Sequence, residues 1–298
     1  LSLAVYISSR VPKLFFWLLF VVALRVLVPL HQNEFAIHMV DVGQGDCIYV
    51  HTPDDRSFLI DGGSTDRKEV DRYQILPFLK YQGTDRLEFV LVTHPDSDHM
   101  NGILEMLEDY EINGIKIGTL LLPDIAEECR NENYLLLLQK AAEKEIPVHL
   151  ISAGEKIRIG GVMLTCMHPQ KSGSYNDTNA GSVVLHLRYG KFTALFTGDL
   201  EGEGERQLLE KLEKQKISLL KVAHHGSSGA TSQEFLDRIV PSVAIISCGQ
   251  DNSYGHPHGE TLQRLEDAGA GIYVTKSCGA ITVKADRTGY FGVSGYIR

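Results

Sequence analysis

Paired cysteines and nucleotide-binding motifs are both missing from this sequence of 298 residues. Its five cysteines are scattered with no Cys-x-x-Cys pair, so neither a zinc ribbon nor a complete disulfide framework is predicted. No Gly-x-x-x-x-Gly-Lys-Ser/Thr pattern occurs, and Ile48 stands where a dinucleotide fingerprint beginning at Gly43-Gln44-Gly45 would need another glycine. The glycines therefore favour a tight turn between two strands. Asp46 is expected to be a turn carboxylate, and the alternative is that it faces the cleft beside this turn. No nucleotide cofactor is expected.

An excess of positive charge is also lacking. The chain has 29 Lys and Arg against 38 Asp and Glu, a formal net charge of −9. The first 33 residues contribute +3, so residues 34–298 carry −12. Such a surface gains little from counterion release on nucleic acid, which disfavours a general DNA-binding face. Attraction for phosphate would have to be local, from bound metal ions and from nearby Lys191, Lys221 or Arg188.

One long apolar run lies near the N-terminus. Residues 14–30 contain a single charge, Arg25, and their length is at the lower limit of the roughly 17–25 residues needed to span a bilayer. Arg10 and Lys13 precede the run, which favours a cytoplasmic N-terminal side and an exported C-terminal part. A buried core helix is the alternative. We expect a membrane-anchor segment over residues 1–33 and one large domain over residues 34–298. Because Leu1 is not an initiator Met, the chain is expected to be a piece of a longer protein.

The most informative stretch is the ten residues from Thr93 to Gly102. It follows the apolar run at residues 87–92 and holds two imidazoles and two carboxylates within six residues, at His94, Asp96, Asp98 and His99. Imidazole and carboxylate are ligands for zinc, manganese and iron. A solvated polar turn is the alternative, and the alternating spacing of the four side chains disfavours it. We predict a metal site.

Three further apolar runs also end in polar residues. Asp61 follows residues 57–60, Asp199 comes shortly after residues 192–196, and the doublet His224-His225 follows residues 218–223. A single Asp after a strand is usually only a turn residue. Several such strand ends are expected to meet at one edge of a sheet, where ligands bind in α/β folds.

The remaining pattern predicts an α/β protein in which two sheets are sandwiched between layers of helices. Strands are predicted at residues 35–40, 47–51, 58–60, 89–93, 119–122, 148–151, 162–167, 183–188, 193–197, 219–223, 243–247 and 281–284. Helices are predicted at residues 73–81, 100–109, 133–145, 203–214, 232–239 and 260–268.

Six motifs in a fixed order resemble those of the metallo-β-lactamase-fold hydrolases, and more narrowly the C-terminal domain of the ComEC-type competence DNA-uptake channel. They are residues 40–46, 60–63, 94–102, 197–199, 224–227 and 254–258. The resemblance covers about residues 35–285 and implies a four-layer αββα sandwich over residues 34–298. It also implies two divalent metal ions, zinc or manganese.

Residue by residue, the resemblance implies a metal-ligand set. His94 and Asp96 would hold the first ion, Asp98 and His99 the second, and Asp199 would bridge both. His224 would supply the last ligand, and spacing leaves His225 as the alternative.

The sequence departs from the wider family in one place. Asn176, Asp177 and Asn179 stand before the strand at residues 183–188, where that family has a histidine, and the ComEC-type proteins are similarly rich in Asn here. The first ion would then lack one strong ligand. Weaker, exchangeable binding there, of manganese for example, is a hypothesis.

Hydrolysis of a phosphodiester requires a nucleophile at neutral pH and neutralisation of charge on the phosphoryl oxygens, which two divalent ions about 3.5–4 Å apart can provide. Asp98 and Asp199 would act with the ions, and Asp98 would orient the attacking water. His258 would protonate the leaving oxygen, and the residues predicted to bind substrate are His225, Ser227, His256 and Asn179. For His256, His258 and Ser227, a structural role in capping or turning a loop is the alternative.

Three hypotheses remain. The leading one is a membrane-anchored phosphodiesterase, part of a membrane channel protein, that acts on DNA on the extracytoplasmic side of the cell membrane during uptake. The second is a hydrolase of the same fold that acts on another phosphodiester or ester. The third is a non-catalytic module that guides DNA, and the full set of carboxylates and imidazoles disfavours it because structural zinc sites are usually closed four-ligand cages.

Overall fold

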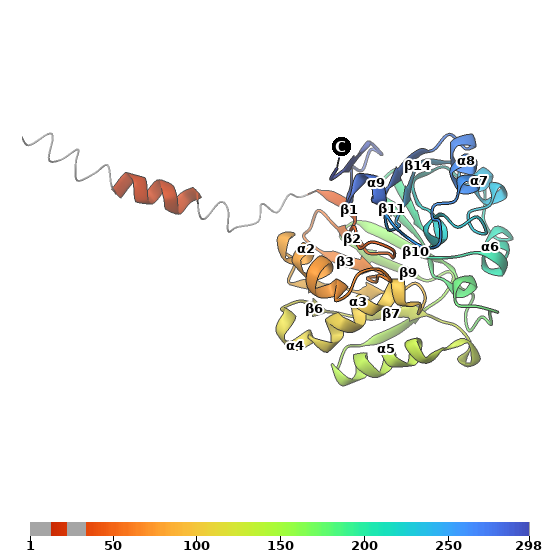
Figure 1. Cartoon of the computed structure of the whole chain (residues 1–298), viewed down its shortest axis with the longest axis horizontal. Helices are drawn as coiled ribbons and strands as arrows, with labels where there is room; N and C mark the ends of the chain where they lie inside the picture. The colour runs from red at the N-terminus through yellow and green to blue at the C-terminus, as the bar shows by residue number, and fades with distance from the viewer. Residues whose placement is uncertain (1–12, 23–33, 298) are drawn as a thin grey trace, which may run out of the picture.

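Two β-sheets stacked against each other form the centre of the protein (Figure 1). The structure is a computed structural model that describes residues 13–22 and 34–297. The first sheet has the strand order β17 (Phe291–Gly295), β16 (Ile281–Ala285), β1 (Phe35–Met39), β2 (Ile48–His51), β3 (Ser57–Ile60), β5 (Val90–Leu91), β7 (Leu120–Pro123) and β8 (Val148–Ile151). The second has the order β15 (Gly271–Val274), β14 (Pro241–Ile246), β13 (Ile217–Lys221), β12 (Phe192–Phe196), β11 (Val184–Tyr189), β10 (Val162–His168) and β9 (Lys156–Ile159). A small separate pair joins β4 (Arg86–Leu87) to β6 (Lys116–Ile117).

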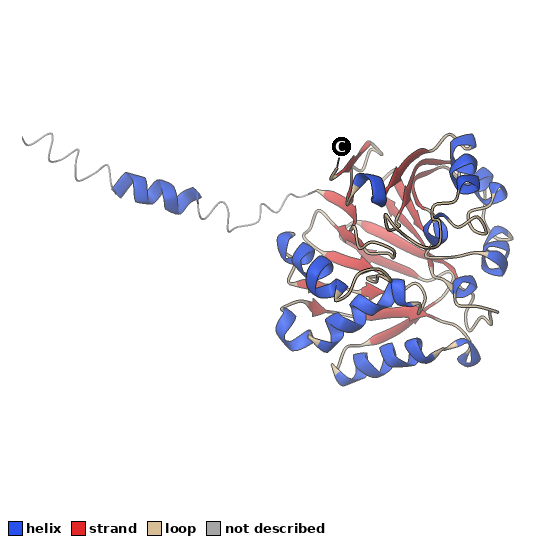
Figure 2. Ribbon diagram, viewed as in Figure 1, coloured by secondary structure: helices blue, strands red, loops and turns tan. Residues whose placement is uncertain are grey.

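Helices cover the outer faces of the two sheets (Figure 2). Beside the first sheet lie η1 (Asp71–Ile75), α2 (Leu76–Tyr81), α3 (Ser97–Glu108), α4 (Tyr110–Asn113) and α5 (Glu132–Glu143). Beside the second lie α6 (Gly202–Leu209), α7 (Gln233–Ile239) and α8 (Gly259–Asp267). The remaining short turns are η2 (Glu127–Cys129), η3 (Asn179–Gly181), η4 (Ala223–Gly226) and α9 (Thr275–Cys278). The predicted sandwich of two sheets between helical layers is confirmed.

The alternation of side chains along the strands separates the hydrophobic core into layers. In β3, Phe58 and Ile60 face the core between the sheets, whereas Leu59 packs in the core beneath the helices. All four residues of β3 are buried because both faces of this strand are covered. In contrast, β10 alternates between buried and half-buried side chains along its whole length.

Parallel strands place the functional loops on the same edge of each sheet. Strands β3, β5, β7 and β8 run parallel to one another, as do β12, β13, β14 and β15. The loops after β3 and β5, and those after β12 and β13, therefore start from the carboxyl ends of neighbouring strands. These are the loops that carry the predicted ligands.

The structure describes only part of residues 1–33, the segment predicted to be a membrane anchor. Residues 13–22 are helical and expose their apolar side chains, including Phe16 and Trp17. The rest of the predicted anchor, residues 1–12 and 23–33, lies outside the described residues. Within the part of the chain that the structure describes, no helix has both the length and the apolar character required to cross a bilayer.

Candidate metal centre

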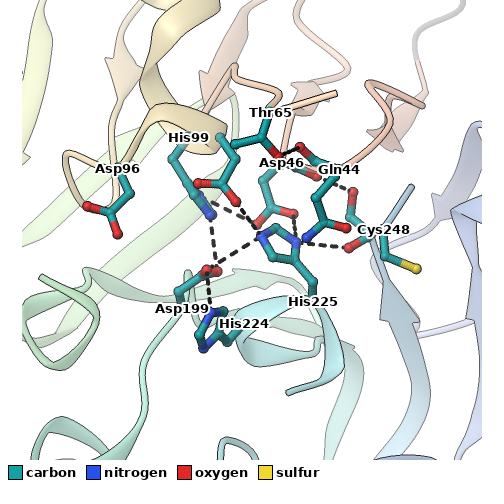
Figure 3. A network of polar contacts seen from close by, with 12 residues as sticks. Gln44, Asp46, Thr65, Asp96, His99, Asp199, His224, His225 and Cys248 are labelled. Atoms are coloured by element: carbon teal, nitrogen blue, oxygen red, sulfur yellow. Dashed lines mark hydrogen bonds and ion pairs between the residues drawn. The ribbon is translucent and has the colours of Figure 1, made fainter. Parts of the chain in front are cut away.

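Four predicted ligands converge at the edge where the two sheets meet. Ligand atoms of Asp98, His99, Asp199 and His225 all lie within 4.8 Å of one another. His99 Nε2 lies 3.1 Å from Asp199 Oδ1, and His225 Nε2 lies 3.2 Å from Asp98 Oδ2 and 3.4 Å from Asp199 Oδ2. In Figure 3, the contacts of His99, His224 and His225 meet at the Asp199 carboxylate. We call these four residues the inner group.

The other three predicted ligands form a looser set around the same carboxylate. His94 Nε2 lies 3.9 Å from Asp199 Oδ2 and 3.7 Å from Asp96 Oδ2, and His224 Nε2 lies 3.8 Å from Asp199 Oδ2. We call His94, Asp96 and His224 the outer group. Asp96 stands apart in Figure 3 and accepts a hydrogen bond from Thr178 Oγ1. The two groups share Asp199, as expected for a bridging ligand.

The consecutive histidines His224 and His225 are arranged differently from the first assignment, in which His224 supplies the last ligand. His225, the alternative, belongs to the inner group, and His224 belongs to the outer one. Both residues have left-handed backbone conformations, with φ of 49° and 52°, which are unusual for residues other than glycine. This tight η4 turn brings two consecutive imidazoles to the same Asp199 carboxylate, at 3.8 Å for His224 and 3.4 Å for His225.

Glycines allow the loops of the centre to approach one another. A Cβ atom on Gly63 would lie 2.5 Å from the carbonyl carbon of Asp98, and one on Gly45 would lie 2.6 Å from the Asp98 carbonyl oxygen. Asp98 and His99 lie in the first turn of α3, which begins at Ser97, so the predicted helix start at residue 100 was three residues late. The absence of a side chain at Gly45 and Gly63 therefore allows α3 to start this close to the loops after β1 and β3.

The donor set fits a metal ion. Buried His94 Nε2 makes no hydrogen bond, and His99 Nε2 and Asp199 Oδ1 face each other as an ion pair at 3.1 Å without one. Buried polar atoms in folded proteins nearly always make hydrogen bonds, so converging atoms that lack them need an explanation. A divalent cation bound by imidazole nitrogens and carboxylate oxygens provides one.

Burial and nearby charges shift the pKa values of His94 and His99 in opposite directions. Burial, with the nearby His99, lowers the pKa of His94 well below its usual value, so His94 is neutral and offers a lone pair. Burial would lower the pKa of His99 too, but the carboxylates of Asp199 and Asp61 outweigh it and raise this pKa well above the usual value. The pKa of Asp199 lies well below its usual value because His99, His225 and Lys221 outweigh the effect of its burial. A bound cation would replace the proton on His99 Nε2, the nitrogen that faces Asp199.

Carboxylates and carbonyls outside the ligand set orient three of the rings. Asp61 Oδ2 lies 2.9 Å from His99 Nδ1, Glu201 Oε2 lies 2.9 Å from His224 Nδ1, and the Ser247 carbonyl lies 2.9 Å from His225 Nδ1. In each case Nδ1 is held so that Nε2 faces Asp199. Such outer partners fix the tautomer and raise the basicity of metal-binding imidazoles.

Asp46 and Lys221 form a buried ion pair beside the centre that the sequence did not reveal. Lys221 is 1% exposed and Asp46 is fully buried, and Lys221 Nζ contacts Asp46 Oδ2. The ammonium also donates to the Gly198 carbonyl at 2.9 Å and lies 3.5 Å from Asp199 Oδ1. The favoured expectation for Asp46, a turn carboxylate, was wrong, and the alternative, that its side chain faces the cleft, agrees with its contact with Lys221. Lys221 is buried and therefore not available to attract phosphate, so the expectation for this residue was wrong.

His256, His258 and Asn179 lie near the outer group, whereas His225, which was also predicted to bind substrate, belongs to the inner group. The ring of His256 is 5.5 Å from that of His224, and the ring of His258 is 5.1 Å from that of His256. His258 Nδ1 accepts a hydrogen bond from the Ser228 amide, so a neutral His258 carries its proton on Nε2. Asn179 Nδ2 donates to Glu201 Oε1 at 3.4 Å. Their roles in binding and catalysis stay predictions.

Ser227 takes part in the turn itself. Its Oγ accepts a hydrogen bond from the Gly229 amide, and its carbonyl accepts one from Thr261 Oγ1. These contacts are those expected of a turn residue, and substrate binding by Ser227 stays a prediction.

Known proteins share both the sequence pattern and the fold. Residues 56–274 match the family described as the beta-lactamase superfamily domain. The chain is 31% identical to ComE operon protein 3 of Bacillus subtilis over 92% of this chain and 36% of that protein. It is 29% identical to competence protein ComA of Neisseria gonorrhoeae over 87% of this chain and 33% of that protein. The chain thus spans about a third of the length of these curated relatives.

Solved structures resemble the chain in fold. The metallo-beta-lactamase fold protein YhfI from Bacillus subtilis superposes with a TM-score of 0.52 at 12% identity, over 88% of this chain and all of that one. The E377D mutant of the CmlA beta-hydroxylase gives a TM-score of 0.50 at 13% identity, over 81% of this chain and 52% of that one. At such identities the likeness concerns the fold alone. The family match confirms the resemblance to the metallo-β-lactamase fold, and the curated relatives similar to this chain include competence proteins. The chain belongs to the metallo-β-lactamase-fold superfamily.

Proposed function

We propose that this protein is a metal-dependent phosphodiesterase that acts on DNA during its uptake. The observation that carries the proposal is the convergence of the inner group, whose four ligand atoms lie within 4.8 Å of one another, with His94 and His224 of the outer group within 4 Å of Asp199. Divalent ions held there would supply Lewis acidity, which activates water and neutralises charge on a scissile phosphate. Similarity to competence proteins supports DNA as the substrate.

Asp98 is suited to orient the attacking water. Burial raises its pKa, but hydrogen bonding with His225 and the nearby His99 outweigh burial and hold this pKa below the usual value. An ionised carboxylate only accepts hydrogen bonds, so it can align a water molecule by accepting a hydrogen bond from it. Asp98 is also half-buried, whereas Asp199 and His99 are buried, and this leaves it the member of the inner group most open to incoming substrate.

His258 is the residue that we propose to protonate the leaving oxygen. In the structure its Nδ1 accepts from the Ser228 amide, which is the neutral form with the proton on Nε2. To act as the acid the ring must first gain a proton on Nδ1 and lose that hydrogen bond, after which the imidazolium gives its Nε2 proton to the leaving oxygen. The ring is separated from His224 by the single ring of His256. Proton donation from a positioned side chain typically contributes 10²–10⁴-fold to a rate. We expect His258→Gln to lower kcat by about this factor and to leave metal binding intact.

The membrane and the channel enter as part of the same proposal. Residues 1–33 would attach the domain to a membrane, with the domain on the extracytoplasmic side, and the exposed apolar side chains of residues 13–22 support this. The relatives' greater length supports a larger membrane protein around the domain. Removal of residues 1–33 should abolish co-sedimentation with lipid vesicles and preserve hydrolysis.

Hydrolysis assays test the proposed function. The purified protein, loaded with Mn²⁺ or Zn²⁺, is incubated with single-stranded DNA, with double-stranded DNA, and with a choline- or lipid-phosphodiester. Cleavage of DNA supports the proposal, and cleavage of the lipid diester alone would assign another substrate to the same site. Binding of DNA without cleavage of any substrate would favour a non-catalytic guide.

A double variant tests the catalytic roles. His99→Ala with Asp199→Ala should reduce hydrolysis to background, because it removes two of the four inner ligands, including the shared one. His149→Ala with Asp237→Ala changes the same residue types at exposed positions and should retain activity. Full hydrolysis by the first double variant would refute the assignment.

A further inference from the structure

Tyr254 presents an aromatic ring beside the candidate metal centre. It lies in the loop before α8 and is 56% exposed. Its ring stacks on that of His256, with centroids 5.6 Å apart and planes inclined by 20°. No function has been assigned to this side chain above. A large ring that is exposed and yet held by a neighbour is a candidate contact for a planar ligand.

His256 connects this ring to the centre. The His256 ring is nearly parallel to that of His225, at 30° and 6.1 Å, and lies 5.5 Å from that of His224. It is 5% exposed, and its buried Nδ1 has no hydrogen-bond partner. Tyr254 is therefore one ring away from both histidines of the doublet. A ligand group resting on Tyr254 would be a neighbour of whatever occupies the centre.

The loop holds its conformation through bonds to its backbone. Asn252 accepts from the His256 amide at 2.8 Å and donates to the His256 carbonyl at 2.9 Å. Lys276 Nζ donates to the same carbonyl at 3.0 Å. Gly226 packs so closely that an added Cβ would lie 2.5 Å from Pro257 Cβ. A surface fixed in this way loses little conformational freedom when a ligand binds, which favours affinity.

We propose that Tyr254 is a stacking platform for the nucleobase next to the scissile phosphate, which makes single-stranded DNA the preferred substrate class. This inference rests on the proposed function. Stacking on an aromatic side chain tolerates any sequence because every base has a flat π-face. In a duplex the bases are already stacked on one another, so only unpaired bases can use the platform. Stacking also suits an acidic domain, whose net charge of −12 over residues 34–298 disfavours affinity through phosphate contacts.

Kinetics on matched oligonucleotides test the platform. Wild type, Tyr254→Ala and Tyr254→Phe are compared on a single-stranded oligonucleotide and on one of the same length with abasic sites. Tyr254→Ala should raise KM for the normal oligonucleotide about 5- to 100-fold, the range for loss of one base–aromatic stack, with little change in kcat. Tyr254→Phe should behave as wild type, and all three should treat the abasic substrate alike. Tyr81→Ala, at an 83% exposed tyrosine of α2, is the matched control and should have no effect.

A binding measurement separates this inference from the proposed function. A short oligonucleotide containing 2-aminopurine is titrated with metal-free protein, and stacking quenches its fluorescence. Quenching by wild type and Tyr254→Phe, and its loss in Tyr254→Ala, would support the platform even if no DNA were cleaved and the proposed function failed. Absence of quenching by wild type would overturn it. Equal losses by Tyr254→Ala on normal and abasic substrates would also overturn it, because Tyr254 would then serve only to hold His256.

Discussion

At the scale of single residues, His224 and His225 are consecutive in sequence but contact different groups. His225 lies with Asp98 and His99 in the inner group, whereas His224 lies farther from Asp199 and is held by Glu201. The inner donors are packed more closely than the outer ones, because no set of three or more described residues whose ligand atoms all lie within 4.8 Å of one another includes an outer-group member. The two sites should therefore differ in affinity.

Titration of the metal-free protein with Mn²⁺, followed by calorimetry, should show a tighter and a weaker phase. His225→Ala should weaken the tighter phase by more than the roughly 10–100-fold that outer-shell changes cost, because it removes a direct ligand. His224→Ala should remove only the weaker phase. If both variants lost the same phase, the division of the doublet between two sites would be wrong.

The buried pair of Lys221 and Asp46 should stabilise the protein without any metal. Burial would lower the pKa of Lys221, but Asp46 and Asp199 outweigh it and raise this pKa, so the lysine is charged. Lys221→Met would leave Asp46 buried without its cation, and loss of one partner of a buried pair typically costs about 3–5 kcal/mol. Urea unfolding in the presence of a chelator measures this cost.

Combining variants isolates the pair itself. Asp46→Asn with Lys221→Met should cost clearly less than the sum of the single changes, with a coupling of at least about 1 kcal/mol. Lys144→Met serves as the control, because its ion pair with Glu111 lies at the surface and should change stability by less than about 1 kcal/mol. Additive effects of the two buried changes would contradict a direct interaction.

At the scale of elements, local pattern predicts the interior of the fold better than its edges. Strands such as β3 and β12 are buried on both faces and read as continuous apolar runs. The strands β9, β15 and β17 of the two large sheets were missed, as were the two-residue strands β4 and β6. Each of the first three is an edge strand with half-buried or exposed residues along most of its length, although the remaining edge strand, β8, was predicted. With one neighbouring strand and partial burial, their sequences carry only a weak apolar signal.

The candidate centre shows the same limit at a finer level. The dense run from His94 to His99 predicts its own convergence because the residues are close in sequence. The contact of Lys221 with Asp46 depends on how the two sheets stack, and neither residue lies in a local pattern that reveals the other. The choice between His224 and His225 depended on the backbone conformation of a tight turn, which spacing does not specify.

The packing of η1 against α3 creates a pH-dependent element. Asp71 at the start of η1 is 3% exposed, and its amide donates to Glu105 of α3. Burial, with the nearby carboxylates of Glu105 and Asp109, raises the pKa of Asp71 to about 7. The folded state therefore binds a proton that the unfolded chain releases above its ordinary pKa of about 3.9. This contribution to stability is complete below about pH 4 and is lost as the pH rises through 7.

Asp71→Asn should remove this dependence, because the amide resembles the protonated acid. We expect the variant to be more stable than wild type by about 1–3 kcal/mol at pH 8 and nearly equal to it at pH 4. Urea unfolding at several pH values measures the difference, and Asp237→Asn on the exposed face of α7 is the control. If the difference in unfolding free energy between the variant and wild type were the same at both pH values, Asp71 would be ionised throughout.

At the scale of the whole molecule, the domain and its proposed substrate, DNA, both carry negative charge. Residues 34–298 carry −12, and Lys221, the lysine beside the centre, is already paired with Asp46 and Asp199. The net charge of residues 34–298 therefore repels DNA at long range. Divalent ions at the centre and stacking on Tyr254 would then supply the local attraction.

The affinity for single-stranded DNA should therefore depend strongly on metal and weakly on salt. Each neutralised phosphate adds about 0.7 to the slope of log affinity against log salt concentration, so two or three contacts predict a slope no steeper than about −2. Fluorescence anisotropy of a labelled oligonucleotide measures this affinity. Two samples that do not cleave DNA should bind it weakly: the His99→Ala, Asp199→Ala double variant, and wild type in the presence of a chelator. Metal-loaded wild type on a cleavage-resistant phosphorothioate oligonucleotide should bind at least about tenfold more tightly than either. A slope near −7 would instead reveal a phosphate-binding track of about ten contacts, and DNA would then be held by a surface that the acidic composition does not predict.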